Sequence, residues 1–184
     1  MGTPQVALKL DIDVNAANSF KTSFFQQFSG VKSWMERITE GCRKEGFVCT
    51  ISGRRRYLPD IASSDGMLRS KAERQAVNSV IQGSAADIMK LAMLKVSRKL
   101  MVWRDKRERE GLPGELVHVP RLLVQIHDEL LFECPSFAED VVGLKNVLQE
   151  TCAVECARDF GLSVSLVLHM SCGKTWGDMR EVRL

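Results

Sequence analysis

Three features that would assign this chain to a broad class of protein are missing from its 184 residues. There is no run of eighteen apolar residues, so a membrane-spanning helix is not expected. No stretch resembles a secretory signal peptide, and the cysteines follow no disulfide framework. Together these absences predict an intracellular, soluble protein with no membrane partner.

The spacing of cysteine and histidine also argues against a structural zinc site. None of the six cysteines forms a Cys-x-x-Cys pair, and the three histidines stand at no zinc-like distance from them. Cys152 and Cys156 are one helical turn apart in an amphipathic segment, which indicates positions in a core. His118 and His169 match no functional pattern and are expected to be structural.

The sequence does contain enough apolar material for one core, since 45% of its residues are hydrophobic. Its net charge of +3 is too small to indicate nucleic-acid binding. The charge is nevertheless uneven, with eight basic residues against four acidic ones between residues 43 and 74. Arg54, Arg55 and Arg56 are consecutive in this stretch. Three adjacent arginines are by themselves typical of an exposed, solvated turn.

Periodicity of the apolar residues divides the chain into helices and short hairpins, without internal repeats. The predicted elements are, in chain order, a helix over 20–44, a hairpin over 47–58, a polar-striped helix that ends before residue 83, a helix over 85–103, a hairpin over 122–133, a helix over 137–160 and a strand over 163–169. Gly46 is expected to end the first helix. Ser52 and Gly53 are expected to form the first turn and to lift the three arginines to its tip.

Two boundaries depend on local signals in the middle of the chain. Gly83 and Ser84 are expected to interrupt the polar-striped helix, because Ser84 and Asp87 have the spacing of a capping box. The next helix would then begin at Ala85. Residues 104–113 carry charges of alternating sign and predict a solvated loop.

The hairpin over 122–133 consists of two apolar, strand-like runs joined at His127, Asp128 and Glu129. A hairpin tip can project a carboxylate into solvent while both arms stay buried. An acidic pair between two hydrophobic strands is costly unless a cation or hydrogen bonds neutralise it. Acidic residues are also common in ordinary turns, so the pattern alone leaves a catalytic and a structural interpretation open.

The polar residues of the central helix are Arg74, Asn78 and Gln82, which recur every four positions and therefore lie on one side. Solvated stripes are usually Glu and Lys, whereas these three side chains offer hydrogen-bond donors. The DNA minor groove presents acceptors at purine N3 and pyrimidine O2 in every base pair. A row of donors would hold correctly paired DNA without reading its sequence. Beside such a helix, the consecutive arginines become candidates for phosphate contacts.

Three segments in this order resemble the C-terminal third of a family A (Pol I-like) DNA polymerase. They are GFVCTISGRRRYLPDI (46–61), AERQAVNSVIQGSAADIMKLA (72–92) and LLVQIHDELLFE (122–133). The resemblance runs from about residue 20 to about residue 179. It predicts that residues 20–184 form a C-terminal palm and fingers portion and that residues 1–19 are an N-terminal extension or an expression remnant. The hairpin wording and the closing GKTWGDM are most similar to the eukaryotic theta and nu branch.

The resemblance implies an α+β fold, with a small antiparallel palm sheet backed by long helices. The sheet would contain the hairpin over 122–133 and the C-terminal strand over 163–169. The implied activity is that of a DNA-directed DNA polymerase, a nucleotidyltransferase in which the primer 3′-hydroxyl attacks a dNTP with the help of two Mg²⁺ ions. The implied partners are primer-template DNA and dNTPs. The branch implies DNA repair in the nucleus, with the mitochondrion as the alternative compartment.

The resemblance also implies roles for individual residues. Asp128 matches the metal-binding aspartate of the hairpin, and Glu129 matches its catalytic neighbour, which lies closer to the primer terminus. The implied DNA contacts are Arg54, Arg74, Asn78, Gln82 and His127. The structural alternative is that His127 is an ordinary turn residue whose ring is hydrogen-bonded within the protein.

Two family strings are absent from this sequence. One reads D-x-S-x-x-E-x-R and carries the other catalytic aspartate, and the other reads K-x6-Y-G and holds the incoming nucleotide. The resemblance therefore implies a Mg²⁺ site completed by an aspartate outside this chain, with the remainder of the polymerase as a partner. The isolated chain is expected to be inactive. A non-catalytic duplex-DNA-binding module is the main alternative, and a metal phosphohydrolase using His127 and Asp128 is a second.

Overall fold

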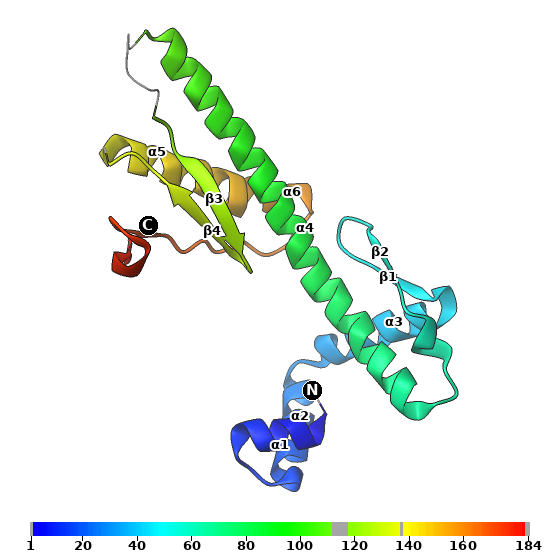
Figure 1. Ribbon diagram of the computed structural model, residues 1–184. Helices are drawn as coiled ribbons and strands as arrows, with labels where there is room; N and C mark the ends of the chain where they lie inside the picture. Colours follow the sequence, from blue (N-terminus) through cyan, green and yellow to red (C-terminus); the bar gives the residue numbers. More distant parts are fainter. Residues whose placement is uncertain (1, 112–117, 137, 183–184) are drawn as a thin grey trace. The chain divides into compact units, whose positions relative to one another are not determined.

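The computed structural model describes residues 2–111, 118–136 and 138–182. Its elements are helices and short antiparallel strands, which confirms the α+β prediction (Figure 1). In chain order they are α1 (Thr3–Leu10), α2 (Val14–Gln27), α3 (Ser29–Glu45), β1 (Phe47–Cys49), β2 (Arg55–Tyr57), the 3₁₀ helix η1 (Pro59–Ala62), α4 (Gly66–Arg109), β3 (Arg121–Ile126), β4 (Glu129–Glu133), α5 (Ala138–Leu148), the π-helix η2 (Gln149–Glu155), α6 (Cys156–Asp159), β5 (Ser171–Cys172), the 3₁₀ helix η3 (Trp176–Asp178) and β6 (Arg180–Glu181). These elements form two compact units, one through Ile81 and one from Gln82. None of the described helices has the length and apolar character needed to cross a bilayer.

The predicted helix over 20–44 is two helices, α2 and α3, separated at Phe28. Phe28 leaves helical geometry, with φ −115° and ψ 58°. Ser29 and Gly30 follow it, and Gly/Ser pairs are common places for a helix to bend. The Asp13 carboxylate caps α2 by accepting the backbone N–H groups of residues 15 and 16 at 2.8 and 2.9 Å. Phe28 is therefore both the C-cap of α2 and the N-cap of α3.

The end of α3 and the first hairpin are as predicted. Gly46 ends α3 in the left-handed conformation with φ 77°, and Gly53 turns the hairpin with φ 81°. Strands β1 and β2 pair antiparallel, with Val48 opposite Arg56. Arg54 lies in the loop, whereas the next two arginines are part of β2. The core of this unit consists of Cys42, Val48, Leu58, Ile61, Ala72 and Ala76.

The interruption predicted at Gly83 and Ser84 is wrong, because α4 is one continuous helix of 44 residues. A glycine inside a helix costs only about 1 kcal/mol relative to alanine. The strong helix formers and buried alanines on both sides, such as Ala76 and Ala92, outweigh that cost. Asp87 is a buried mid-helix residue and does not belong to a first turn.

The charged loop predicted over 104–113 is also wrong as far as Arg109, because α4 continues to that residue. Side chains of opposite charge that are four residues apart form ion pairs, which stabilise the helix. Arg104 lies 3.6 Å from Glu108, and Lys106 lies 3.7 Å from Glu110. Residues 112 and 113 of the predicted loop lie outside the described residues.

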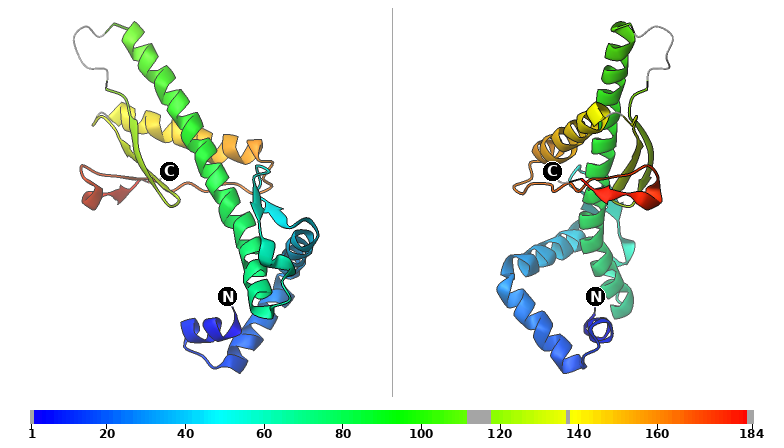
Figure 2. Two further views of the ribbon diagram at one scale, coloured as in Figure 1. Left: turned by 45° about the vertical axis from the view of Figure 1, so that its right-hand side comes forward. Right: turned by 90° about the vertical axis from the view of Figure 1, so that its left-hand side faces the viewer.

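The second unit has its own core between α4 and α5. Val96 and Leu100 of α4 pack with Leu144 and Leu148 of α5, and Phe132 of β4 covers them. Figures 1 and 2 show α5 and the β3–β4 hairpin beside the C-terminal half of α4. The hairpin is thus anchored through β4.

The helix predicted over 137–160 is confirmed as one helical segment, made of α5, η2 and α6, that ends before Gly161 with φ 60°. Its predicted first residue, Phe137, lies outside the described residues. Cys156 is fully buried and Cys152 packs on the core, as predicted.

The strand predicted over 163–169 is wrong. Leu168 packs on the second core, but Val164 and Val167 are 67% and 79% exposed, so the segment lacks the continuous buried face that fixes a strand register. The described strands form three separate two-stranded sheets: β1–β2, β3–β4 and β5–β6. A C-terminal strand therefore does not join the β3–β4 hairpin, contrary to the predicted palm sheet.

Candidate functional site

The β3–β4 hairpin places His127 and Asp128 in a two-residue loop. Ile126 and Glu129 are the last paired residues, which confirms the predicted tight turn. His127 has φ 54°, the positive value that two-residue hairpin loops require. The Gln125 side-chain amide donates to the His127 carbonyl oxygen at 2.5 Å and holds the loop. A non-glycine residue with positive φ is uncommon and often marks a functional position.

The acidic pair at this tip is fully available to a ligand. Asp128 and Glu129 are exposed, and their carboxylates have no hydrogen bond or ion pair with any residue that the structure describes. No described residue therefore compensates their charge. The prediction that both arms are buried is wrong for β3, where Leu123 is 56% and Val124 is 40% exposed. A bulge between Leu122 and Val124 shifts the register there, so the alternation of buried and exposed residues fails.

The hairpin carboxylates are the right type of ligand for Mg²⁺, which prefers hard oxygen donors. Their number is insufficient, because the described residues contain no group of three or more His, Cys, Asp or Glu side chains that could hold a metal. Asp128 and Glu129 therefore do not make up a metal site with any other described residues. A Mg²⁺ site at Asp128, completed by an aspartate outside this chain, stays a prediction.

The polar stripe lies on one face of α4, opposite the core. Arg74, Asn78 and Gln82 are exposed, whereas Ala72 and Ala76 on the other side are at most 1% exposed. The Arg74 guanidinium donates to the Ser70 hydroxyl at 2.7 Å. The side-chain amides of Asn78 and Gln82 have no partner among the described residues. The two amides of the stripe thus present hydrogen-bond donors that the described part of the chain does not use.

Arg54 is positioned by the backbone of the first hairpin. The Thr50 N–H donates to the Arg54 carbonyl oxygen at 3.0 Å, and the Arg54 N–H donates to the Thr50 hydroxyl at 3.2 Å. Arg54, Arg55 and Arg56 are all exposed. The predicted site residues therefore form three groups on three elements: the β1–β2 loop, one face of α4 and the tip of the β3–β4 hairpin.

An ionic cluster on the second half of α4 was not predicted from the sequence. Lys95 pairs with Glu155 and Asp159 at 3.0 and 2.7 Å, and Lys99 pairs with Glu150 and Glu155 at 2.8 and 2.7 Å. Hydrogen bonds from Lys99 and Lys95 hold the pKa of the Glu155 carboxyl at about 2. Because all its charges are paired internally, this cluster joins α4 to η2 and α6 and does not form a ligand site. The paired residues are far apart in the sequence, so no local sequence pattern indicates the cluster.

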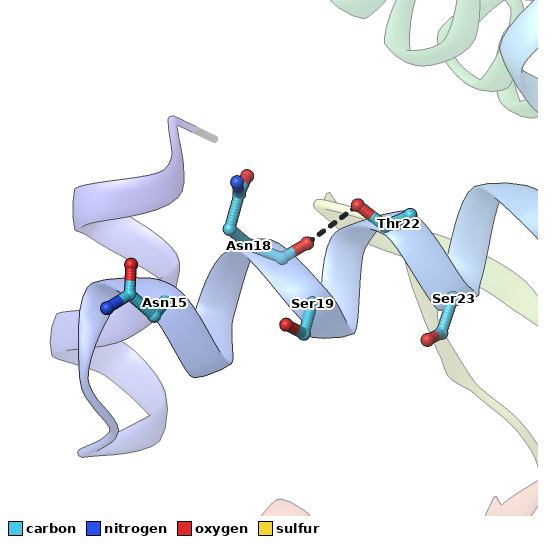
Figure 3. Close-up of a pocket in the computed structure, with 5 residues that line it drawn as sticks. All are labelled: Asn15, Asn18, Ser19, Thr22 and Ser23. Carbon is cyan, nitrogen blue, oxygen red and sulfur yellow. Dashed lines mark hydrogen bonds between the residues drawn. The ribbon is translucent and has the colours of Figure 1, made fainter.

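Neither the Cys134 and Cys152 thiols nor the surface hollow on α2 offers an alternative reactive site. Burial raises the pKa of the Cys134 and Cys152 thiols to about 11, so both are protonated near neutral pH. Figure 3 shows a polar hollow, and its lining residues are Asn15, Asn18, Ser19, Thr22 and Ser23. The Thr22 hydroxyl donates to the Asn18 carbonyl oxygen at 3.0 Å. None of these side chains titrates near neutral pH, so this hollow lacks the groups for acid–base catalysis.

Known proteins are similar to this chain in sequence and in fold. DNA polymerase theta is 37% identical over 183 residues in Drosophila melanogaster and 33% identical over 201 residues in Mus musculus; each match covers 98–99% of this chain and 8% of the relative. DNA polymerase I of Bacillus caldotenax is 38% identical over 175 residues, which are 95% of this chain and 18% of that protein.

The fold is similar to the POL domain of Pol1 from M. smegmatis, solved in complex with DNA primer-template and dNTP. The TM-score is 0.68 at 35% identity, over 83% of this chain and 24% of that one. The chain therefore spans less than a fifth of the polymerases named above and about a quarter of this structure. The family model described as DNA polymerase family A matches residues 1–178, including the segment 1–19. With the hairpin and the striped helix in the expected places, the chain belongs to DNA polymerase family A.

Proposed function

We propose that this chain provides the metal-binding hairpin and the duplex-binding helix of a DNA-directed DNA polymerase. The observation that carries the proposal is the tip of the β3–β4 hairpin, where Asp128 and Glu129 are exposed and have no partner among the described residues. An acidic pair presented in this way on a tight loop is suited to a cation and a phosphate-bearing substrate. Family membership supports nucleotidyl transfer as the reaction.

Each residue at the tip has a separate part in this proposal. Asp128 would bind Mg²⁺, together with a carboxylate from outside this chain. When bound, the metal ions lower the pKa of the primer 3′-hydroxyl and neutralise charge on the reacting phosphate. Glu129 would lie beside the primer terminus, and His127, held with positive φ, would contact the primer strand near its end.

The donor stripe of α4 supports duplex DNA as the macromolecular substrate. Arg74, Asn78 and Gln82 would donate hydrogen bonds to minor-groove acceptors, which every correct base pair presents. Arg54 would contact a phosphate and help to position the duplex without reading its sequence. A mispaired primer end would displace the acceptors and lose these hydrogen bonds. dNTPs are the second substrate in this proposal.

The similarity to DNA polymerase theta supports a narrower biological role. We infer that the polymerase acts in DNA repair in the nucleus, with Mg²⁺ as its metal.

The direct test is Asp128→Ala in a polymerase chain that carries residues 1–184. Loss of a metal ligand should lower kcat for primer extension by about 10³-fold, because a bound metal stabilises the reacting charges by several kcal/mol. Duplex affinity should change by less than about twofold, since Asp128 is not part of the donor stripe. Asp105→Ala, which removes a half-exposed carboxylate from α4, is the matched control and should leave kcat unchanged. Unchanged extension in Asp128→Ala would contradict the proposal.

The 184-residue chain alone gives a second test. It should bind duplex DNA but show no primer extension with Mg²⁺, because its described residues do not complete a metal site. Extension that disappears in Asp128→Ala would show that no outside carboxylate is needed. The non-catalytic duplex-binding module would be the better function if Asn78→Ala weakened duplex binding while no Asp128 variant altered any synthesis.

A further inference from the structure

The β1–β2 hairpin has an outer face that the proposed site does not use. Val48 points into the first core and is 6% exposed, so its neighbours on β1 point to the other side. The strand register places Tyr57 opposite Phe47 and Arg55 opposite Cys49. Phe47, Arg55 and Tyr57 therefore share the face that looks away from the core.

These three side chains are in contact with one another. The rings of Phe47 and Tyr57 lie 5.5 Å apart at an interplanar angle of 58°. The Arg55 guanidinium lies 4.6 Å from the centre of the Phe47 ring, within the range of a cation–π interaction. The contacts hold both Arg55 and Tyr57 in place on the hairpin. We call this group of three the outer-face cluster.

A purely structural role explains the pairing of the rings but not the exposure of one of them. Cross-strand aromatic pairs stabilise hairpins by covering each other. Tyr57 is nevertheless 66% exposed, so much of its ring remains in contact with solvent. Arg55, which is exposed and lies on the same face, supplies positive charge beside the aromatic pair.

An exposed aromatic ring beside positive charge is the combination that binds single-stranded nucleic acid. Bases stack on the ring whatever their sequence, and the basic groups hold the backbone. Paired bases inside a duplex are already stacked on each other, so their faces are not available to a side chain. We propose that Tyr57 stacks on an unpaired base of single-stranded DNA, while Arg55 contacts an adjoining phosphate. The choice of DNA rests on the proposed function, whereas the stacking site rests on the outer-face cluster.

The test measures binding of a fluorescent single-stranded oligonucleotide by anisotropy. Tyr57→Ala should weaken binding by about 5- to 100-fold, the range typical of losing one stacked base. Tyr57→Phe retains the ring and should bind as the unmodified chain does. Tyr57→Leu still covers Phe47 but has no aromatic face, so it should lose affinity like the alanine variant. This leucine variant separates stacking from damage to the hairpin.

An oligonucleotide of the same length with abasic sites separates stacking from phosphate binding. It has the same charge but no bases, so the unmodified chain and Tyr57→Ala should bind it equally. Unchanged affinity of Tyr57→Ala for the normal oligonucleotide would overturn the proposal, as would an equal loss on both oligonucleotides.

A blunt duplex, measured in parallel, distinguishes this proposal from the proposed function. Asn78→Ala should weaken duplex binding, and Tyr57→Ala should not. A duplex defect in Tyr57→Ala as large as its single-strand defect would overturn the stacking site. Normal duplex binding by Asn78→Ala would instead contradict the role of the α4 stripe and leave the Tyr57 result unaffected.

Discussion

The two halves of α4 use their polar side chains in opposite ways. In the first half the stripe of Arg74, Asn78 and Gln82 is exposed, and its two amides have no partner among the described residues. In the second half Lys95 and Lys99 are each paired with two carboxylates. The comparison separates donors that stabilise the fold from donors that are available to a ligand. The sequence alone does not distinguish the two kinds of donor, because each half of α4 has polar side chains at helical spacing.

The largest effect on stability is expected from Asp140→Ala. Asp140 is fully buried on α5 and forms an ion pair with Arg107 of α4, whose side chain is 28% exposed. Removing the carboxylate leaves a partly buried guanidinium unpaired and should lower the free energy of unfolding by about 3 kcal/mol. Urea denaturation measures the change. Glu139→Ala removes an exposed carboxylate from the same turn and should cost less than about 1 kcal/mol. Equal losses would show that the second half of α4 does not depend on this pair.

A smaller loss of stability is expected from Gly143→Ala. A Cβ atom at this position would lie 2.5 Å from a ring carbon of Trp103 on α4. Overpacking of this kind costs about 1–3 kcal/mol, which thermal or urea unfolding would reveal. Gly41→Ala in α3 is the matched control, because nothing lies within 4 Å of its Cβ position. It should stabilise the chain by about 0.5–1 kcal/mol through helix propensity. Unchanged stability of Gly143→Ala would mean that α5 packs less closely on Trp103 than the structure shows.

The ionic cluster should make stability depend on acid pH. Its lysines lower the pKa of the Glu155 carboxyl from the usual 4.5 to about 2 in the folded chain. A depressed folded pKa contributes stability above pH 4.5, and this contribution is lost as the pH falls from 4.5 towards 2. Urea unfolding at several pH values should therefore show a shallower acid dependence for Glu155→Gln than for the unmodified chain. Glu150→Gln, at a 65% exposed side chain with one lysine partner, should change the profile less. If the free energy of unfolding depended on pH in the same way for all three proteins, Glu155 would be excluded as the source of the acid dependence.

Local signals predicted the elements that surround the candidate site. Gly46 and Gly53 set a helix end and a turn, and both have the positive φ that their positions require. The apolar runs on either side of His127 and Asp128 predicted the β3–β4 hairpin. The four-residue spacing of the stripe correctly placed its members on one exposed helix face.

The errors arose where tertiary context overrode a local signal. Gly83 and Ser84 indicated a break in the helix. The strong helix formers around them outweigh that signal, so α4 continues through both positions. Polar and apolar residues alternate over 163–169 as in a strand. The Val167 side chain is nevertheless exposed, and the segment does not pair with a strand. The pairing of Lys95 and Lys99 with carboxylates more than fifty residues away has no local signal at all.

The most direct test of the account compares Asn78→Ala with Lys99→Ala, one variant from each half of α4. Affinity for primer-template duplex and free energy of unfolding are measured for both. Asn78→Ala should weaken duplex binding by about 3- to 10-fold, the value of one or two hydrogen bonds, and leave stability within about 0.5 kcal/mol. Lys99→Ala should lower stability and keep duplex affinity within about twofold. Undiminished duplex binding by Asn78→Ala, or a binding defect confined to Lys99→Ala, would contradict the assignment of the exposed stripe to DNA.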